Sequence, residues 1–132
     1  MTINAYNEIA AETEVLDANP HRLIQLMLDR CLQQMQLAKH FMGRKEINKK
    51  CEAIAKAHDI IIHLRAALNH NDEQAKQLSQ KLNLVYEYIE KCLFKSNLKN
   101  DAALLDEAIS KLMPIKTSWD HIGESNENKK HE

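Results

Sequence analysis

The sequence predicts an all-α fold, an antiparallel up-down four-helix bundle. Its 132 residues suit one domain with a sizeable core, and only 2 glycines and 2 prolines leave little of the chain for turns. Apolar residues recur at alternating steps of three and four through four successive segments, which is the spacing of one helix face. The connections between these segments are short, so neighbouring helices should run antiparallel.

The first helix is expected to begin at Asn19-Pro20, because asparagine can cap a helix and proline is tolerated at the first helical position. Gly43 should end it. Its inward face is predicted to hold Ile24, Leu28, Cys31, Met35, Ala38 and Met42. In the second helix, His58 and Arg65 interrupt the inward face, which holds Ile47, Cys51, Ile54, Ile61 and Leu68.

Asp72 is the predicted cap of the third helix and Asp101 that of the fourth. Pro114 should bend the fourth helix near Ser110, because proline removes one backbone hydrogen bond. The inward face of the third helix is predicted to hold Ala75, Leu78, Leu82, Val85, Ile89, Cys92 and Ser96. That of the fourth is predicted to hold Leu105, Ala108, Leu112, Ile115 and Trp119.

The bundle is expected to span residues 19–122, with a different segment at each end. Residues 1–18 are predicted to be a short mobile segment packed on the bundle, because they form an amphipathic stretch ahead of the Asn19-Pro20 break. Residues 123–132 are too polar to bury a face and are predicted to be a disordered tail.

Composition excludes several classes of function. With 18 basic and 19 acidic residues, the chain has no positive excess for nucleic acid. It contains no apolar run of the ~18 residues that a membrane span needs, and no signal-like start, so we expect a cytoplasmic protein without membrane insertion. Three widely spaced cysteines indicate neither a disulfide framework nor a zinc site.

Catalytic and metal chemistry are also not indicated. Glu-x-x-His pairs, which hold metals inside helical bundles, do not occur, and neither does His-x-x-x-His. Two glycines cannot build a phosphate-binding loop. We therefore expect no enzyme activity, no cofactor and no metal.

The helices carry more apolar surface than one bundle requires. Extra apolar residues flank the inward faces at Leu23, Leu26, Leu37 and Phe41, then at Ala53, Ile60, Leu64 and Ala67, and finally at Leu84 and Tyr88. These flanks either pack against neighbouring helices or form an exposed groove for an amphipathic partner helix. Tyr6 and Ile9 belong to a segment that can cover such a groove until a ligand displaces it.

Several polar and aromatic residues have two interpretations. Tyr86 is expected in the core, whereas Tyr88 is the better candidate for partner contact. Trp119 either closes the end of the bundle or contacts a partner. Asn97, like Asp29 and Asp59, either sets helix geometry or binds the backbone of a partner.

Six landmarks follow one another along the chain. They are Tyr6; Asn19-Pro20-x-x-Leu23-Ile24 leading to Leu26-Met27-Leu28-Asp29; Ala57-x-Asp59-Ile60-Ile61-x-x-Leu64; Leu82-x-x-Val85-Tyr86-x-Tyr88-Ile89; Leu93 to Asn97; and a helix closing on Trp119. This order resembles the flagellin-specific export chaperones of the FliS family over nearly the whole chain. The family usually has Tyr-Asp-Gly where this chain has Leu28-Asp29-Arg30.

The resemblance implies a cytosolic chaperone that binds the disordered C-terminal segment of flagellin. Binding would prevent premature polymerisation and deliver flagellin to the flagellar type III export gate, with the segment around Tyr6 covering part of the groove beforehand. The predicted partner-binding residues are Tyr6, Ile9, Leu23, Leu26, Ile60, Leu64, Leu84, Tyr88, Asn97 and Trp119. The alternatives are a helical adaptor or self-associating scaffold that forms a homodimer, and a metal-binding helical bundle.

Overall fold

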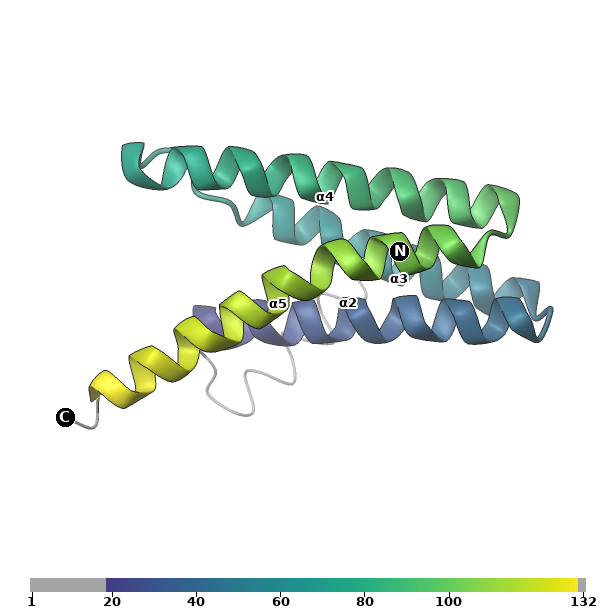
Figure 1. The fold of residues 1–132 in the computed structure, drawn as a ribbon, viewed down its shortest axis with the longest axis horizontal. Helices are drawn as coiled ribbons and strands as arrows, with labels where there is room; N and C mark the ends of the chain where they lie inside the picture. The colour runs from purple at the N-terminus through teal and green to yellow at the C-terminus, as the bar shows by residue number, and fades with distance from the viewer. Residues whose placement is uncertain (1–18, 131–132) are drawn as a thin grey trace.

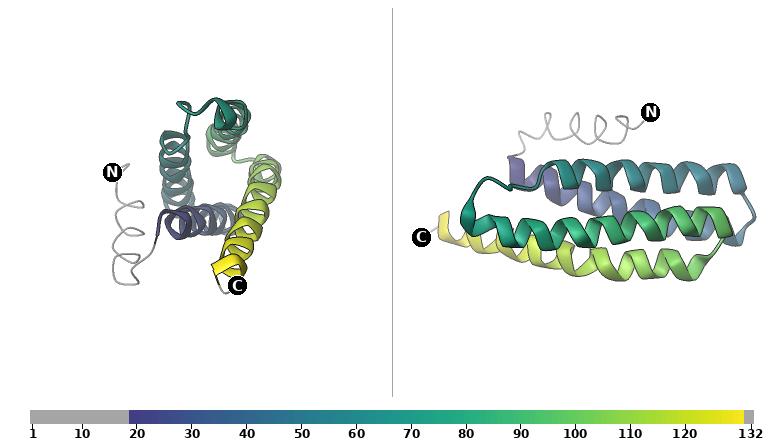
Figure 2. Two further views of the ribbon diagram at one scale, coloured as in Figure 1. Left: turned by 90° about the vertical axis from the view of Figure 1, so that its left-hand side faces the viewer. Right: turned by 90° about the horizontal axis from the view of Figure 1, so that it is seen from above.

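The computed structural model describes the backbone of residues 19–130 and the side chains of residues 19–123. This part of the chain forms four helices, α2 (Pro20–Gly43), α3 (Ile47–Ala66), α4 (Glu73–Lys99) and α5 (Ala102–Lys130) (Figure 1). Each helix packs against two neighbours, because α2 and α4 both contact α3 and α5. The end-on view shows this four-sided arrangement (Figure 2). The predicted all-α four-helix bundle is confirmed.

The helix starts follow the predicted capping residues. The Asn19 side chain accepts a hydrogen bond from the Arg22 backbone N–H at 2.8 Å, with Pro20 in the first turn. Asp72 accepts one from the Gln74 N–H at 3.0 Å and begins α4. Gly43 is the last residue of α2, but the left-handed backbone of the following turn lies at Lys45, with φ of 59°.

The predicted inward faces form most of the core. Ile47 and Leu78 are exceptions, because both are exposed near the beginnings of their helices. Partly buried residues, among them Ile24, Leu82 and Trp119, pack around the buried ones. Fully or almost fully buried positions include Leu28, Cys31, Met35, Ala38, Ile54, Ile61, Tyr86, Ile89, Leu93, Leu105, Ala108 and Leu112.

Helix α5 departs from the sequence prediction at its C-terminal end. Its backbone stays helical to Lys130, where a disordered tail was expected from residue 123. Pro114 lies inside this helix, as the sequence predicts. A helix that already exists can extend by one hydrogen bond per residue without a new nucleus, so polar sequence does not end it. Residues 131–132 and the predicted mobile segment 1–18 lie outside the described residues.

Polar side chains tie α5 to α2. Lys116 forms an ion pair with Asp29 at 3.0 Å and another with Asp120, and Asp120 also accepts a hydrogen bond from Gln25 at 2.5 Å. Burial alone would lower the pKa of Lys116, but its bonds to Asp120 and Asp29 outweigh burial and raise that pKa. Burial likewise acts to raise the pKa of Asp120, but the contacts of Asp120 with Lys116 and Gln25 outweigh burial and lower that pKa.

Candidate partner-binding surface

The outward face of α4 carries four large apolar side chains. Leu84, Tyr88, Phe94 and Leu98 are 64%, 43%, 69% and 73% exposed, respectively. At about 100° per residue these four positions fall within about 120° of one another around the helix. We call them the α4 stripe.

The opposite face of α4 is also apolar and faces the core. Tyr86, Ile89 and Leu93 are buried there, together with the small side chains of Cys92 and Ser96. A helix of a monomeric bundle needs only one apolar face, and its solvent side is normally polar. The α4 stripe is therefore surface that the bundle itself does not use, which is typical of a site for another polypeptide.

Tyr88 is fixed at the edge of the stripe beside α5. Its hydroxyl donates a hydrogen bond to Glu107 Oε1 at 3.1 Å. This hydrogen bond, more than any other contact, raises the pKa of Tyr88 to about 12. The hydroxyl is therefore anchored to α5, and Tyr88 presents its aromatic ring at the surface.

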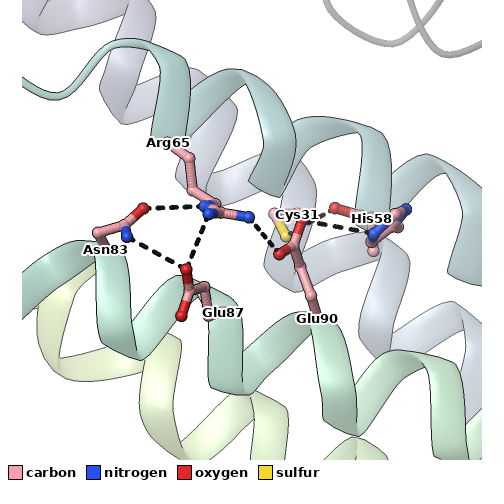
Figure 3. Close-up of polar contacts among 7 residues, drawn as sticks. Cys31, His58, Arg65, Asn83, Glu87 and Glu90 are labelled. Atoms are coloured by element: carbon pink, nitrogen blue, oxygen red, sulfur yellow. Dashed lines mark hydrogen bonds and ion pairs between the residues drawn. The ribbon is translucent and has the colours of Figure 1, made fainter.

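A polar cluster joins α3 to α4 beside the stripe (Figure 3). The Arg65 guanidinium donates to Asn83 Oδ1 at 2.9 Å, Glu87 Oε1 at 3.0 Å and Glu90 Oε2 at 2.6 Å. His58 Nε2 lies 3.5 Å from the other Glu90 oxygen. Arg65 of α3 thus contacts both glutamates and holds this flank of α4 in place.

Lys50 supports the C-terminal end of α4 from the neighbouring α3. Its ammonium group is buried and donates to the Asn97 carbonyl at 3.2 Å and to Asn100 Oδ1 at 2.6 Å. These contacts satisfy oxygens at a helix end, where backbone carbonyls lack helical partners. The Asn97 side chain accepts a hydrogen bond from the Cys51 thiol at 3.3 Å. Asn97 thus has a structural role in this conformation.

Trp119 closes the opposite end of the bundle. Its indole stacks on the His21 ring with centroids 4.6 Å apart, and its Nε1–H donates to the His21 carbonyl at 2.9 Å. Gly123 permits this contact, because a Cβ there would lie 2.5 Å from His21 Nε2. Beneath Trp119 is an apolar cavity of about 250 Å³ whose lining includes Leu28, Leu82 and Ile115.

The described residues hold neither a metal-ligand cluster nor a membrane-spanning helix. Among residues 19–123, histidine, cysteine and acidic side chains form no group of three that could hold a metal ion. Within the described helices, none combines the length and apolar character needed to cross a membrane.

Comparison with known families agrees with this architecture. The model of a family described as flagellar protein FliS matches residues 2–126. The chain belongs to the FliS family. It is 40% identical over 117 residues to the flagellar secretion chaperone FliSB of Pseudomonas aeruginosa, an alignment that covers 89% of this chain and 91% of that protein.

Two further relatives carry the name flagellar secretion chaperone FliS. That of Salmonella typhimurium is 31% identical over 121 residues, covering 91% of this chain and 88% of its own length. That of Vibrio cholerae is 29% identical over 121 residues, covering 92% and 88%. The resemblance of the six landmarks to the FliS family is thereby confirmed.

Leu28-Asp29-Arg30 stands where the FliS family usually has Tyr-Asp-Gly, and the structure shows the contacts of its first two residues. Leu28 is fully buried in the core, and Asp29 pairs with Lys116 across the α2–α5 interface. Asp59 is buried as well, with His63 Nε2 3.6 Å from its Oδ1. The ion pair of Asp29 favours the interpretation in which it sets helix geometry, whereas the two buried Asp59 oxygens have no hydrogen-bond partner among residues 19–123.

The predicted partner-binding residues fall into separate groups. Leu84 and Tyr88 lie together on the α4 stripe, whereas Leu23 and Leu26 are partly buried and pack against the core. Asn97 and Trp119 make the structural contacts described above. Tyr6 and Ile9 lie outside the described residues.

Of the two alternatives for the apolar flanks, Ile60 and Leu64 follow the one in which they pack against neighbouring helices, and they are not exposed for a partner. They are 0% and 2% exposed and belong to the central core. Helical spacing gives the direction of a side chain within its own helix, but it does not show how closely the neighbouring element packs. The extra apolar face of α3 is therefore core, and that of α4 is surface.

Sequence reasoning missed Phe94 and Leu98, the two most exposed members of the stripe. The signal was present, because each lies more than 100° from the inward face at about 100° per residue. If outward-facing apolar positions are followed beyond Tyr88 to the end of α4, the sequence identifies both residues. The complete stripe runs from Leu84 to Leu98, about 21 Å at a rise of 1.5 Å per residue.

Proposed function

We propose that this protein is a cytosolic export chaperone that binds the disordered C-terminal segment of flagellin. The observation that carries the proposal is the α4 stripe, four apolar side chains left exposed on a helix whose opposite face already supplies the core. Membership of the FliS family, whose members are named flagellar secretion chaperones, supports a flagellar protein as the cargo.

The stripe has the dimensions of a helix-binding site. Its length of about 21 Å corresponds to about four turns of a partner helix laid along it. An amphipathic segment that is disordered alone loses conformational entropy when it folds on a surface, and it must gain enough apolar burial to offset that loss. Leu84, Phe94 and Leu98 offer large side chains for this burial, at the spacing that helical partners use.

Covering that segment has a direct consequence for assembly. The apolar face that binds the chaperone is unavailable for packing against other flagellin molecules, so the cargo stays unpolymerised. A bound, partly folded segment can then be handed to the flagellar type III export gate. The protein itself performs no catalysis in this scheme and requires no cofactor.

Residues 1–18 are the proposed displaceable cover of the binding surface. Tyr6 and Ile9 give this segment an apolar side. A tethered ligand competes at a high effective concentration, so its removal should strengthen cargo binding. Deletion of residues 1–18 is therefore expected to tighten flagellin binding, and unchanged affinity would eliminate the role of a cover.

Titration with a peptide that spans the flagellin C-terminus tests the proposal. Circular dichroism should show more helix in the mixture than in the sum of the two components, because the peptide folds as it binds. The Phe94→Ala/Leu98→Ala variant should weaken binding at least about tenfold, as expected for central apolar contacts.

A matched control is Ile47→Ala, which removes an exposed apolar side chain at the start of α3. Its affinity should stay close to that of the wild type. Absence of peptide binding by the wild-type chain would reject the proposal. Light scattering over a concentration series separates it from the self-associating scaffold, which predicts dimers that the Phe94→Ala/Leu98→Ala variant does not form.

A further inference from the structure

The lysines of α4 differ from those of the other helices. Every helical lysine with a described side chain in α2, α3 and α5 has an ion-pair or hydrogen-bond partner: Lys39, Lys49, Lys50, Lys56, Lys111 and Lys116. Within residues 19–123, no ion pair or hydrogen bond involves the side chain of any of the five lysines of α4, which are Lys76, Lys81, Lys91, Lys95 and Lys99. Uncompensated positive charge is thus concentrated on this one helix.

Three of these lysines flank the exposed end of the stripe. Lys91, Lys95 and Lys99 are spaced four residues apart, which places them in a row along the helix beside Phe94 and Leu98. A surface depression of about 340 Å³ lies at this point, and Lys91, Phe94 and Lys95 help to line it.

Nearby acidic groups only partly offset the charge of this row. Glu87 and Glu90 also line the depression, but both are held by the Arg65 guanidinium, at 3.0 Å and 2.6 Å. The single Arg65 charge balances one of these two carboxylates, so the remaining negative charge offsets the row of three lysines only in part. The C-terminal half of α4 presents apolar side chains between lysines that form no ion pair among residues 19–123.

We propose that the C-terminal half of α4 recognises an acidic stretch of the flagellin segment, whose carboxylates pair with Lys91, Lys95 and Lys99 while its apolar side chains cover Phe94 and Leu98. The inference rests on the proposed function and adds the charge of the segment that the stripe binds. A second copy of this chain is a poorer occupant, because stripes packed face to face would bring rows of lysines together.

The charges are expected to act mainly on encounter and register. An exposed ion pair contributes little by itself, about 0.2–1 kcal/mol, whereas a row of like charges steers an opposite partner and speeds its association. Such steering weakens as salt shortens the range of the field. Salt dependence therefore distinguishes the lysine row from the apolar contacts beside it.

The test compares two double variants of the full chain that change the net charge equally. Lys91→Glu/Lys95→Glu reverses the row, and Lys76→Glu/Lys81→Glu reverses two unpaired lysines near the start of the same helix. A fluorescent flagellin C-terminal peptide reports association rate and affinity at low and high ionic strength. Thermal unfolding checks that both variants remain folded.

At low ionic strength, Lys91→Glu/Lys95→Glu should weaken binding about tenfold, chiefly through slower association, and the difference should shrink at high ionic strength. Lys76→Glu/Lys81→Glu should change affinity less than about twofold. A peptide whose acidic residues are replaced by lysine should bind Lys91→Glu/Lys95→Glu better than it binds the wild type.

Equal binding by the two double variants, with normal binding by the wild type, would overturn this inference and leave the proposed function standing. Failure of the charge-swapped peptide to prefer Lys91→Glu/Lys95→Glu would also overturn it. If the wild-type chain binds no flagellin peptide at all, the proposed function itself is rejected, and the inference is rejected with it.

Discussion

The two faces of α4 are both apolar but have different surroundings. Tyr86, Ile89 and Leu93 point into the bundle and are buried, whereas Phe94 and Leu98 point outward and are largely exposed. Adjacent residues of one helix thus serve different purposes, because the inward face stabilises the fold and the outward face remains available for a partner. Hydrophobicity alone does not distinguish core from binding surface; the neighbouring helices do.

The charged side chains of this region show the same division. Lys50 reaches from α3 to the end of α4 and is buried against Asn97 and Asn100. Lys91 and Lys95 lie on the outward face of α4 with no ion pair among the described residues. Lysines that support the bundle have hydrogen-bond partners within it, whereas those beside the stripe form no ion pair among the described residues.

The largest expected effect separates Leu93 from its neighbour Phe94. Leu93→Ala removes a fully buried side chain and should lower the free energy of unfolding by about 2–5 kcal/mol. Phe94→Ala removes an exposed one and should change it by less than about 0.5 kcal/mol while weakening peptide binding. Urea unfolding of both variants measures the difference, and equal destabilisation would contradict the division between the two faces.

A smaller effect is expected at Lys50. Lys50→Ala leaves the Asn97 carbonyl and the Asn100 side chain without their donor, so the free energy of unfolding should fall by about 1–3 kcal/mol. Lys49→Ala is the control, because that side chain is exposed and its pair with Glu46 is long, at 3.9 Å. Thermal unfolding compares the two, and a similar loss in both would show that Lys50 does not support the end of α4.

The smallest effect concerns the two tyrosines of α4. Burial raises the pKa of Tyr86 to about 12, whereas the hydrogen bond to Glu107 is the main cause of the same value at Tyr88. Glu107→Gln should therefore bring the pKa of Tyr88 towards the ordinary value of about 10 and leave Tyr86 unchanged. The ultraviolet absorbance of tyrosinate, followed in a Tyr6→Phe background, measures this change, and a response by both tyrosines would show a shared cause.

Tyr86 also links alkaline pH to stability. The folded state favours its neutral form, so the native chain binds this proton more tightly than the unfolded chain. The stabilisation is complete below pH of about 10, the pKa expected for an unfolded tyrosine, and is lost as pH rises towards about 12. Tyr86→Phe should reduce this alkaline loss.

Local signals in the sequence predicted much of the fold. Asn19 and Asp72 cap their helices as expected, because capping depends on residues a few positions apart. The burial of Leu28 and Ile89 likewise follows from spacing within one helix. The helical backbone of residues 123–130 was not foreseen, because their polar composition does not reveal that a preceding helix will extend through them.

Only half of the α4 stripe was predicted. Leu84 and Tyr88 were found from their direction within α4, but Ile60 and Leu64 gave the same signal on α3 and are buried. The difference depends on contacts between residues distant in sequence, which helical spacing does not contain. The unpaired state of the α4 lysines depends on tertiary contacts in the same way.

Chemical-shift mapping of the isotope-labelled 15.2 kDa chain during titration with the flagellin C-terminal peptide tests the central claim most directly. We expect the largest amide shifts to cluster along α4 between residues 84 and 99, and Phe94→Ala/Leu98→Ala to remove them. Shifts confined to the α2–α5 interface, with α4 unchanged while the peptide binds, would contradict this claim.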